Sequence, residues 1–106
     1  MNATGIDIVL HPPARLQIAA LLAKVTDAEF AKLREVTGVS DSVMSKHLSA
    51  LVEAGYVTLR KDARDGRQRT WAALTRAGRS AFNGHVKALQ AIVAGAMEDE
   101  RPEGVA

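Results

Sequence analysis

A chain of 106 residues is long enough for one domain with its own core and too short for two. Cysteine is absent, which excludes disulfides and thiolate metal sites and fits a reducing cytoplasm. No stretch approaches the roughly 18 apolar residues of a membrane span, and no basic leader precedes an apolar run. We therefore expect a cytoplasmic domain without a signal peptide. Because alanine is abundant and aromatic residues are few, its core should be thin and helix-rich.

Charge is distributed unevenly along the chain. The formal net charge is only +2, which by itself says little about partners. Between Arg60 and Arg79, however, seven basic side chains accompany two acidic ones, for a local balance of +5. Residues 98–103 carry a balance of −3, and we interpret residues 98–106 as a solvated acidic tail. The basic segment favours contact with a polyanion.

The first part of the sequence predicts one helix after an ambiguous start. Residues 1–10 contain apolar side chains that either pack or form a short edge segment. A helix is predicted over about 13–24, because Pro13 is tolerated at the first helical position, where its missing N–H is not needed. The candidate packing positions of this helix are Leu16, Ala19, Ala20, Leu22 and Ala23.

A second helix is predicted to follow after a short interruption. Thr26 and Glu29 have the spacing of a capping box, in which each side chain satisfies a free backbone N–H at a helix start. The helix should then run to about Thr37, where Gly38 suits a left-handed stop. The residues that we expect this helix to bury are Phe30, Leu33 and Val36.

The third helix has two contrasting faces. Ser40 is its expected N-cap and Gly55 its stop, and two short helices joined by such a turn form a helix-turn-helix. Its apolar stripe consists of Met44, Leu48 and Leu51. Its opposite face carries Ser42, Ser45, Lys46 and Ser49. Serine is a mediocre helix former, whereas short hydroxyls beside one cation suit close approach to phosphates and base edges. Our hypothesis is that this helix reads DNA.

A basic β-hairpin is predicted directly after this helix. Residues 56–61 and 67–74 are rich in strand-forming residues, and the intervening segment 62–66 ends in Asp65-Gly66, a strong hairpin signal. A basic hairpin after a helix-turn-helix is a wing. Together these elements predict a mainly α fold with a small β-hairpin (α+β), with a winged-helix core over residues 13–74.

A long last helix is predicted over residues 75–97, with Thr75 as its N-cap. Its apolar residues follow a spacing of 4, 3, 4 and 3 and form a seam of Phe82, Val86, Leu89, Val93 and Ala96. This seam either covers the first helix of the same chain or pairs with a second copy, and we favour homodimerisation because the core is thin. His85 neighbours the seam, and Trp71 packs either there or under the wing.

With these motifs in view, the chain resembles the winged helix-turn-helix transcriptional regulators of the MarR and ArsR type. The resemblance covers about residues 13–93. It rests on Phe30-Ala31-Lys32-Leu33, Val39-Ser40, Ser45-Lys46-His47-Leu48, Leu51 with Glu53-Ala54-Gly55-Tyr56-Val57, Asp65-Gly66-Arg67 and Leu74-Thr75-Arg76-Ala77-Gly78. It implies that the third helix enters the major groove and that the wing reaches the minor groove or backbone. It also implies a dimer with a long C-terminal dimerisation helix.

Two departures from the family narrow what the resemblance implies. The metal-sensing branch uses a cysteine motif on the recognition helix, and this chain has no cysteine. The longer MarR proteins have extra terminal helices that help to form an effector pocket, for which this chain has no room. The resemblance therefore supports DNA binding and dimerisation more than ligand sensing.

The expected DNA contacts lie on the third helix and the wing. Serine hydroxyls suit phosphates or base edges, Lys46 a phosphate or a guanine edge, and Val43 a thymine methyl. His47 either contacts DNA or makes a local hydrogen bond. Guanidinium groups on the wing suit a narrow minor groove, while Asp62 and Asp65 shape the turn or orient an arginine. The candidate DNA-binding residues are Ser40, Ser42, Val43, Ser45, Lys46, His47, Ser49, Arg64, Arg67 and Arg69. The alternative for each group is a solvated surface.

Metal binding and catalysis are not expected. The three histidines (His11, His47 and His85) are scattered without ligand spacing, and we find neither a phosphate-binding glycine loop nor a nucleophile assisted by histidine. We predict a homodimeric transcriptional regulator without a cofactor, more specifically a repressor that binds a pseudo-palindromic operator in double-stranded DNA. The alternatives are a winged helix that binds proteins, or a regulator with a small-molecule effector site at the dimer interface.

Overall fold

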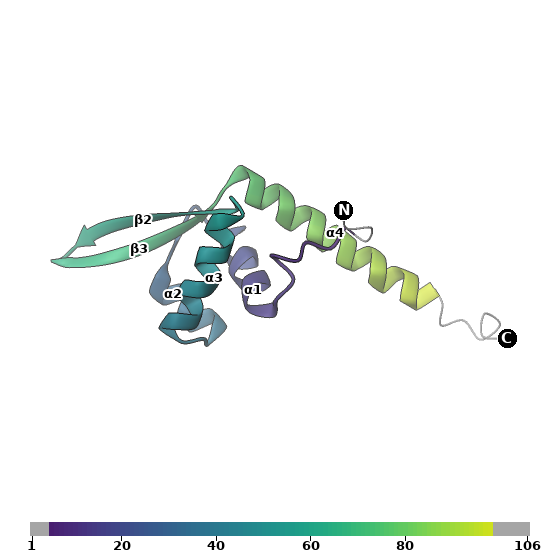
Figure 1. The fold of residues 1–106 in the computed structure, drawn as a ribbon, viewed down its shortest axis with the longest axis horizontal. Coiled ribbons are helices and arrows are strands. Elements are labelled where there is room, and N and C mark those ends of the chain that lie inside the picture. The colour runs from purple at the N-terminus through teal and green to yellow at the C-terminus, as the bar shows by residue number, and fades with distance from the viewer. Residues whose placement is uncertain (1–4, 99–106) are drawn as a thin grey trace.

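The computed structural model describes residues 5–98 and gives a winged helix fold of four helices and a small antiparallel sheet (Figure 1). The side chain of Arg64 and most of the predicted acidic tail, residues 99–106, lie outside the described part. The elements in chain order are α1 (Pro13–Leu22), β1 (Ala28–Glu29), α2 (Phe30–Thr37), α3 (Asp41–Glu53), β2 (Val57–Arg64), β3 (Arg67–Leu74) and α4 (Arg76–Glu98). The predicted mainly α fold with a β-hairpin is confirmed.

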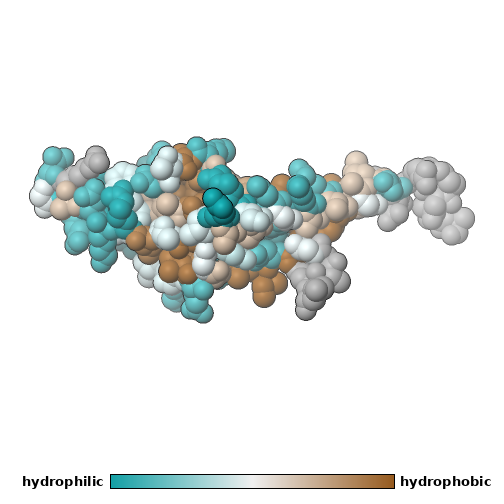
Figure 2. Space-filling view, turned by 90° about the horizontal axis from the view of Figure 1, so that it is seen from above, coloured by the Kyte–Doolittle hydropathy of each residue, from teal (hydrophilic) through white to brown (hydrophobic). Residues whose placement is uncertain are grey.

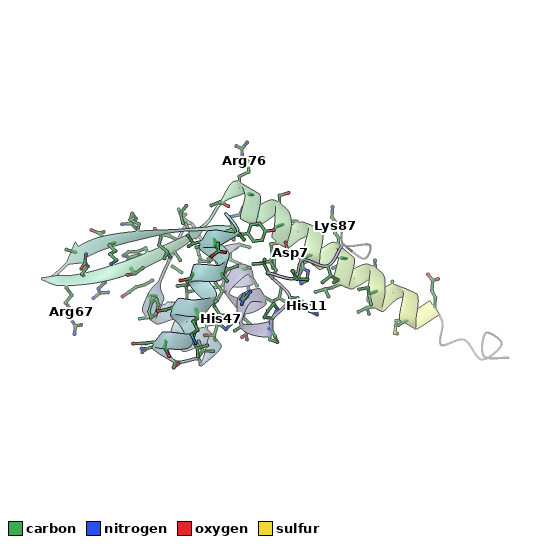
Figure 3. All side chains as sticks on the ribbon, viewed as in Figure 1. Asp7, His11, His47, Arg67, Arg76 and Lys87 are labelled. Carbon is green, nitrogen blue, oxygen red and sulfur yellow. The ribbon has the colours of Figure 1, made fainter. Side chains whose placement is uncertain are left out.

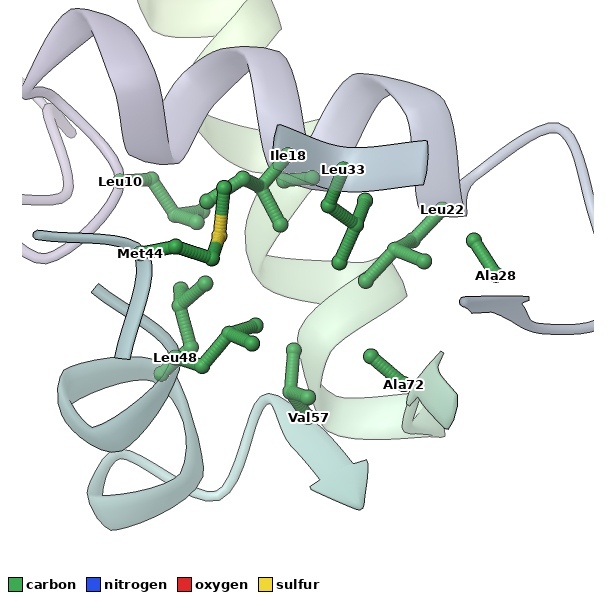
Figure 4. Packing of buried hydrophobic residues seen from close by; sticks show 11 residues of the cluster. Leu10, Ile18, Leu22, Ala28, Leu33, Met44, Leu48, Val57 and Ala72 are labelled. Atoms are coloured by element: carbon green, nitrogen blue, oxygen red, sulfur yellow. The ribbon is translucent and has the colours of Figure 1, made fainter. Parts of the chain in front are cut away.

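The core lies between the three short helices and the base of the sheet. Figure 4 shows side chains from α1, α2 and α3 packed together, with Val57 and Ala72 closing the cluster from the sheet. The predicted stripe of α3 is confirmed, since its three apolar residues are buried. Ile18 is fully buried although its position was not predicted, whereas Val36, which we expected to be buried, is 43% exposed. Val36 lies in the last turn of α2, where the chain leaves the core toward Gly38.

The predicted capping box before α2 is wrong. The N-cap of α2 is Glu29, whose side chain makes no capping hydrogen bond. Instead, Ala28 and Glu29 form the edge strand β1, which pairs with β3 at Ala72 and Trp71. Residues 28 and 29 are therefore extended rather than helical, and the strand order is β1-β3-β2. A partner far along the chain overrides the local spacing.

The turn between α2 and α3 is built as the sequence predicts. Gly38 ends α2 in the left-handed conformation at φ 74°, which glycine adopts without steric cost. Ser40 caps α3, because its Oγ accepts a hydrogen bond from the backbone N–H of Val43 at 3.3 Å. Arg34 of α2 forms an ion pair with Asp41, the first residue of α3. This pair ties the two helices of the helix-turn-helix together across their turn.

The wing is longer than predicted, because its turn is tighter. Arg64 pairs with Arg67, which leaves only Asp65 and Gly66 in the turn. Both have positive φ angles, 53° and 74°, as a two-residue hairpin turn of type I′ requires. The preceding residues 62–64 thus belong to β2 rather than to the turn, and the hairpin projects well beyond the helices (Figure 1).

Helix α4 begins at a close junction with the end of α3. Thr75 caps it as predicted, since its Oγ1 accepts a hydrogen bond from the N–H of Gly78 at 2.9 Å and donates one to Gly55 O at 2.7 Å. A Cβ at Gly78 would lie 2.2 Å from the carbonyl oxygen of Tyr56. Only glycine allows this approach of α4 to the chain that links α3 to the wing. From there α4 runs away from the domain body (Figure 1).

The N-terminal segment is held between α4 and the start of the wing. The backbone N–H of Asp7 donates to Nδ1 of His85 on α4 at 3.0 Å, and Oδ2 of Asp7 accepts from the hydroxyl of Tyr56 at 2.6 Å. Oδ1 accepts from the N–H of Val9 at 2.8 Å. In residues 5–10, packing holds for Val9, which lies against the core cluster beside the fully buried Leu10, whereas Ile8 is 79% exposed.

Candidate nucleic-acid interface

The outer face of α3 presents polar side chains to solvent. Ser42, Ser45, Lys46 and Ser49 are all exposed, and Val43 is 39% exposed at the border of this face. Their positions follow from the buried stripe, since 3.6 residues per turn place them opposite or beside Met44, Leu48 and Leu51. The structure therefore brings the predicted residues of α3 together on one accessible surface. We call this helix the recognition helix from here on.

Ser40 differs from the other serines because its hydroxyl already has partners. Besides capping α3, its Oγ lies 3.3 Å from Oγ of Ser42. Its structural role is the N-cap, and its position at the helix start is exposed. The helix start also carries partial positive charge from unpaired backbone N–H groups, which favours a phosphate.

His47 makes the local hydrogen bond that was one of its two predicted readings. Its Nδ1 accepts a hydrogen bond from Nε of Arg15 on α1 at 3.1 Å. Burial lowers the pKa of His47, and the positive charge of Arg15 lowers it further. Because Nδ1 is an acceptor, the ring is neutral with its proton on Nε2. The histidine is half-buried on the side of the recognition helix that faces α1.

The two predicted wing arginines whose side chains the structure describes have different surroundings. Arg67 is exposed near the hairpin tip and projects on the same side of the molecule as His47 (Figure 3). Arg69 is half-buried, and its Nη1 lies 3.2 Å from Oε1 of Glu29 on β1. The ion pair anchors Arg69 to the edge strand, whereas Arg67 is uncommitted.

Arg60 holds the base of the wing. Its guanidinium forms ion pairs with Asp27 at 3.0 Å and Asp62 at 3.2 Å, and it lies 5.7 Å from the ring centre of Trp71. The hydrogen bond that Arg60 donates to Asp27 is the largest cause that raises the pKa of Arg60, and Asp62 adds to it. Trp71 therefore belongs to the wing rather than to the seam. Asp62 orients an arginine, as one of its two predicted roles.

A cleft between the recognition helix and the wing adds two residues that the sequence analysis missed. It has a volume of about 220 Å³ and is lined by Phe30, Ser45, Leu48, Ser49, Leu59, Lys61 and Thr70. Lys61 and Thr70 are paired across the hairpin and face the serines of α3. Strand alternation from the buried Val57 was the signal for them, because every second residue of β2 points to the same side.

The apolar seam of α4 is divided between two environments. Phe82 packs against the core cluster, and Val86 and Leu89 are half-buried. Farther along the helix, Val93 is 60% exposed and Met97 is 63% exposed. Phe82 is thus the seam residue that packs on the chain's own core, whereas the buried residues of α4, which are Gly78, His85 and Ala88, form a neighbouring stripe. The second half of the seam offers an apolar surface on a helix that extends beyond the domain.

No group of three or more His, Cys, Asp or Glu residues in residues 5–98 has the arrangement to hold a metal ion. His85 is buried, with the edge of His11 toward its ring at 5.5 Å between centres. Burial lowers the pKa of His85, and His11 lowers it further. No described helix is both long and apolar enough to cross a membrane.

Comparisons with known proteins agree with this geometry. A family model described as a winged helix DNA-binding domain matches residues 14–93. The uncharacterized protein MJ0432 of Methanocaldococcus jannaschii is 32% identical over 78 residues, which cover 74% of this chain and 85% of that protein.

Solved structures share the fold. A transcriptional regulator homologue from Pyrococcus horikoshii has a TM-score of 0.79 and 26% identity, covering 85% of this chain and 89% of its own. The transcriptional repressor BigR from Xylella fastidiosa has a TM-score of 0.63 and 26% identity, covering 80% and 79%. YusO from Bacillus subtilis, at 20% identity, shows the fold alone, with a TM-score of 0.74 and coverage of 96% and 68%. Two of these three proteins are named as a transcriptional regulator homologue and a transcriptional repressor. The family model covers most of the chain, and the chain therefore belongs to the winged helix DNA-binding domain family.

Proposed function

We propose that this protein is a sequence-specific transcriptional regulator that binds double-stranded DNA with the recognition helix in the major groove. The observation that carries the proposal is the outer face of α3, where three exposed hydroxyls and one amine lie together, and of these only Ser42 has a hydrogen-bond partner among the described residues. The helix that presents them is fixed by a cap, an ion pair and a buried stripe. Such preorganised donors beside a basic wing fit base edges and phosphates.

Each candidate residue has a role that its position supports. Ser42, Ser45 and Lys46 are placed for base edges or nearby phosphates, and Ser49, together with Lys61, for the backbone in the cleft. Val43 is placed for a thymine methyl. Arg67, with Arg64 beside it in the hairpin, reaches the minor groove, while Arg69 supports the wing through Glu29. Phosphate contacts should supply most of the affinity, which makes binding strongly dependent on salt.

We further propose that the protein acts in the cytoplasm as a homodimeric repressor. The exposed apolar end of α4 supports pairing with a second copy. A two-fold dimer presents two recognition helices about one DNA turn apart and therefore reads a pseudo-palindromic operator. Occupancy of that operator would block polymerase sterically.

Fluorescence anisotropy with labelled duplexes tests this function. Lys46→Ala combined with Ser45→Ala should abolish the preference for a selected operator over random DNA, because base contacts specify sequence. Arg67→Ala should weaken binding to every duplex and reduce the salt slope by about 1. Arg76→Ala is the matched control, since Arg76 projects from the opposite side of the molecule (Figure 3). Unchanged binding in both test variants would instead support a winged helix that docks proteins.

A further inference from the structure

Arg15 is fixed beside the recognition helix by two hydrogen bonds. Its Nε donates to Nδ1 of His47 at 3.1 Å, and its Nη1 donates to the carbonyl oxygen of Val9 at 3.3 Å. The side chain is half-buried, so its aliphatic part is held between α1 and α3. These contacts use one N–H of Nε and one of Nη1. The other N–H groups of the guanidinium donate no hydrogen bond to any residue in 5–98.

Arg15 also differs from other arginines around the interface because it forms no ion pair with a described carboxylate. Arg34, Arg60 and Arg69 each form an ion pair with a carboxylate. No described carboxylate lies within ion-pair distance of Arg15, and its neighbour His47 is neutral, with a pKa lowered in part by that positive charge. A half-buried, immobilised cation without a counter-ion is a favourable place for an anion.

The position of this pair relative to the DNA-facing surface indicates which anion. His47 follows Lys46 directly and lies one helical turn from Val43, on the side of α3 that faces α1. The other side of α3 borders the cleft that contains Lys61 and Thr70. The recognition helix therefore has a cation on each flank. A major groove is bordered by two phosphate backbones, so a helix inserted in it has a backbone on each side.

We infer that Arg15 and His47 form a phosphate-binding site that holds one DNA backbone on the flank of the recognition helix opposite the wing. This inference rests on the proposed DNA binding and adds a contact from α1. The free donors of Arg15 and the Nε2–H of His47 would both donate to phosphate oxygens. Because a phosphate contact carries no sequence information, the site fixes the register of the recognition helix in the groove.

Four variants test the site in anisotropy titrations at several salt concentrations. Arg15→Gln should weaken binding about three- to tenfold on selected and random duplexes alike, and reduce the salt slope by about 1. Arg15→Lys keeps the charge and should keep the slope. His47→Asn keeps an acceptor for Arg15 but removes the Nε2 donor, and should weaken binding less than Arg15→Gln does. Arg76→Gln, which removes an equal charge on the opposite side, should bind like the wild type.

Ethylation interference on the selected operator provides a second measurement that does not depend on fold stability. At one phosphate per half-site, ethylation should inhibit DNA binding by the wild type but not by Arg15→Gln. At all other phosphates the two proteins should respond alike. The inference is overturned if Arg15→Gln has the affinity and salt slope of the wild type while Lys46→Ala and Arg67→Ala bind more weakly. It is also overturned if ethylation inhibits Arg15→Gln at every phosphate where it inhibits the wild type. Failure of the wild type to bind any duplex would overturn the proposed function, and this site with it.

Discussion

Asp7 connects three parts of the molecule that lie far apart in the sequence. Its carboxylate accepts a hydrogen bond from the hydroxyl of Tyr56 at the start of the wing, while its backbone N–H donates to His85 on α4. The partners are 49 and 78 positions away along the chain. The hydrogen bond that Tyr56 donates to Asp7 is the largest cause that raises the pKa of Tyr56 to about 12, followed by burial and the carboxylate charge.

At the residue scale, the first prediction concerns this pair. The pKa of Tyr56 in the folded state is above the unfolded value of about 10. Its contribution to stability is therefore complete below pH 10 and is lost as the pH rises through about 12. Asp7→Asn should lower the pKa of Tyr56 toward 10 and move alkaline unfolding to lower pH. Tyrosinate absorbance measures both cleanly, because the chain has one tyrosine.

Asp65→Asn is the control for this titration. It also removes one carboxylate, but from the exposed wing turn, where asparagine tolerates the positive φ angle. Its titration should match the wild type. A pKa of Tyr56 that is equally high in Asp7→Asn would contradict the assigned cause.

The sequence predicts which face of the recognition helix is polar. It does not predict which side chains on that helix form hydrogen bonds within the protein. The serine face of α3 follows from helical spacing alone, and the structure exposes it as expected. Two hydrogen bonds depend on how α1 and β1 pack against elements far along the chain, namely those from Arg15 to His47 and from Arg69 to Glu29. No local pattern encodes such contacts. Lys61 was predictable in principle, because strand alternation places it on the side of the buried Val57.

At the element scale, the arrangement of α4 depends on contacts at its beginning. Thr75, Gly78 and the backbone of Tyr56 bring the end of α3, the start of the wing and α4 into one junction. The Leu-Thr-x-x-Gly sequence indicated a helix start, and the structure gives the physical reason for its glycine. The predicted capping box before α2 does not form, because Ala28 and Glu29 are extended and pair with β3 far along the chain.

Two glycine substitutions in the same helix should have opposite effects. Gly78→Ala would place a Cβ 2.2 Å from the Tyr56 carbonyl oxygen, which is backbone and cannot rotate away. We expect it to lower the free energy of unfolding by about 1–3 kcal/mol. Gly84→Ala meets no atom within 4 Å and should raise that free energy by about 0.5–1 kcal/mol, since alanine is the better helix former.

Chemical denaturation of the two variants beside the wild type distinguishes these effects. The junction is contradicted if Gly78→Ala is as stable as the wild type. It is also contradicted if both substitutions change stability in the same direction by the same amount.

At the scale of the whole molecule, one end of the protein is polar and basic, and the middle exposes apolar surface. Figure 2 shows hydrophilic side chains over the wing and hydrophobic ones over the middle of the molecule. The exposed apolar residues of α4 continue beyond the part that covers the core. The heptad-like spacing predicted an apolar seam, but only the structure shows at which residue the seam loses contact with the core and becomes exposed. A dimer interface depends on contacts between two chains. The local sequence pattern therefore does not predict which surface a second copy covers.

The proposed dimer makes a direct prediction about this part of α4. Val93→Asp places a charge on the exposed apolar surface and should reduce self-association at least tenfold in sedimentation measurements, because a buried unpaired charge is costly. Binding to a single half-site should survive, while binding to a full operator should weaken. Asn83→Asp is the control on the same helix and should self-associate like the wild type. A wild-type protein that is monomeric at all measured concentrations would contradict the dimer.

Selection of bound duplexes from random-sequence DNA tests the central claim most directly, because the protein itself chooses the sequence that it binds. The account predicts enrichment of a pseudo-palindromic sequence whose half-sites lie about 10–10.5 base pairs apart, centre to centre. It also predicts that Lys46→Ala with Ser45→Ala loses this enrichment. Recovery of no common sequence by the wild-type protein, at salt low enough for binding, would contradict the claim that the outer face of α3 reads DNA.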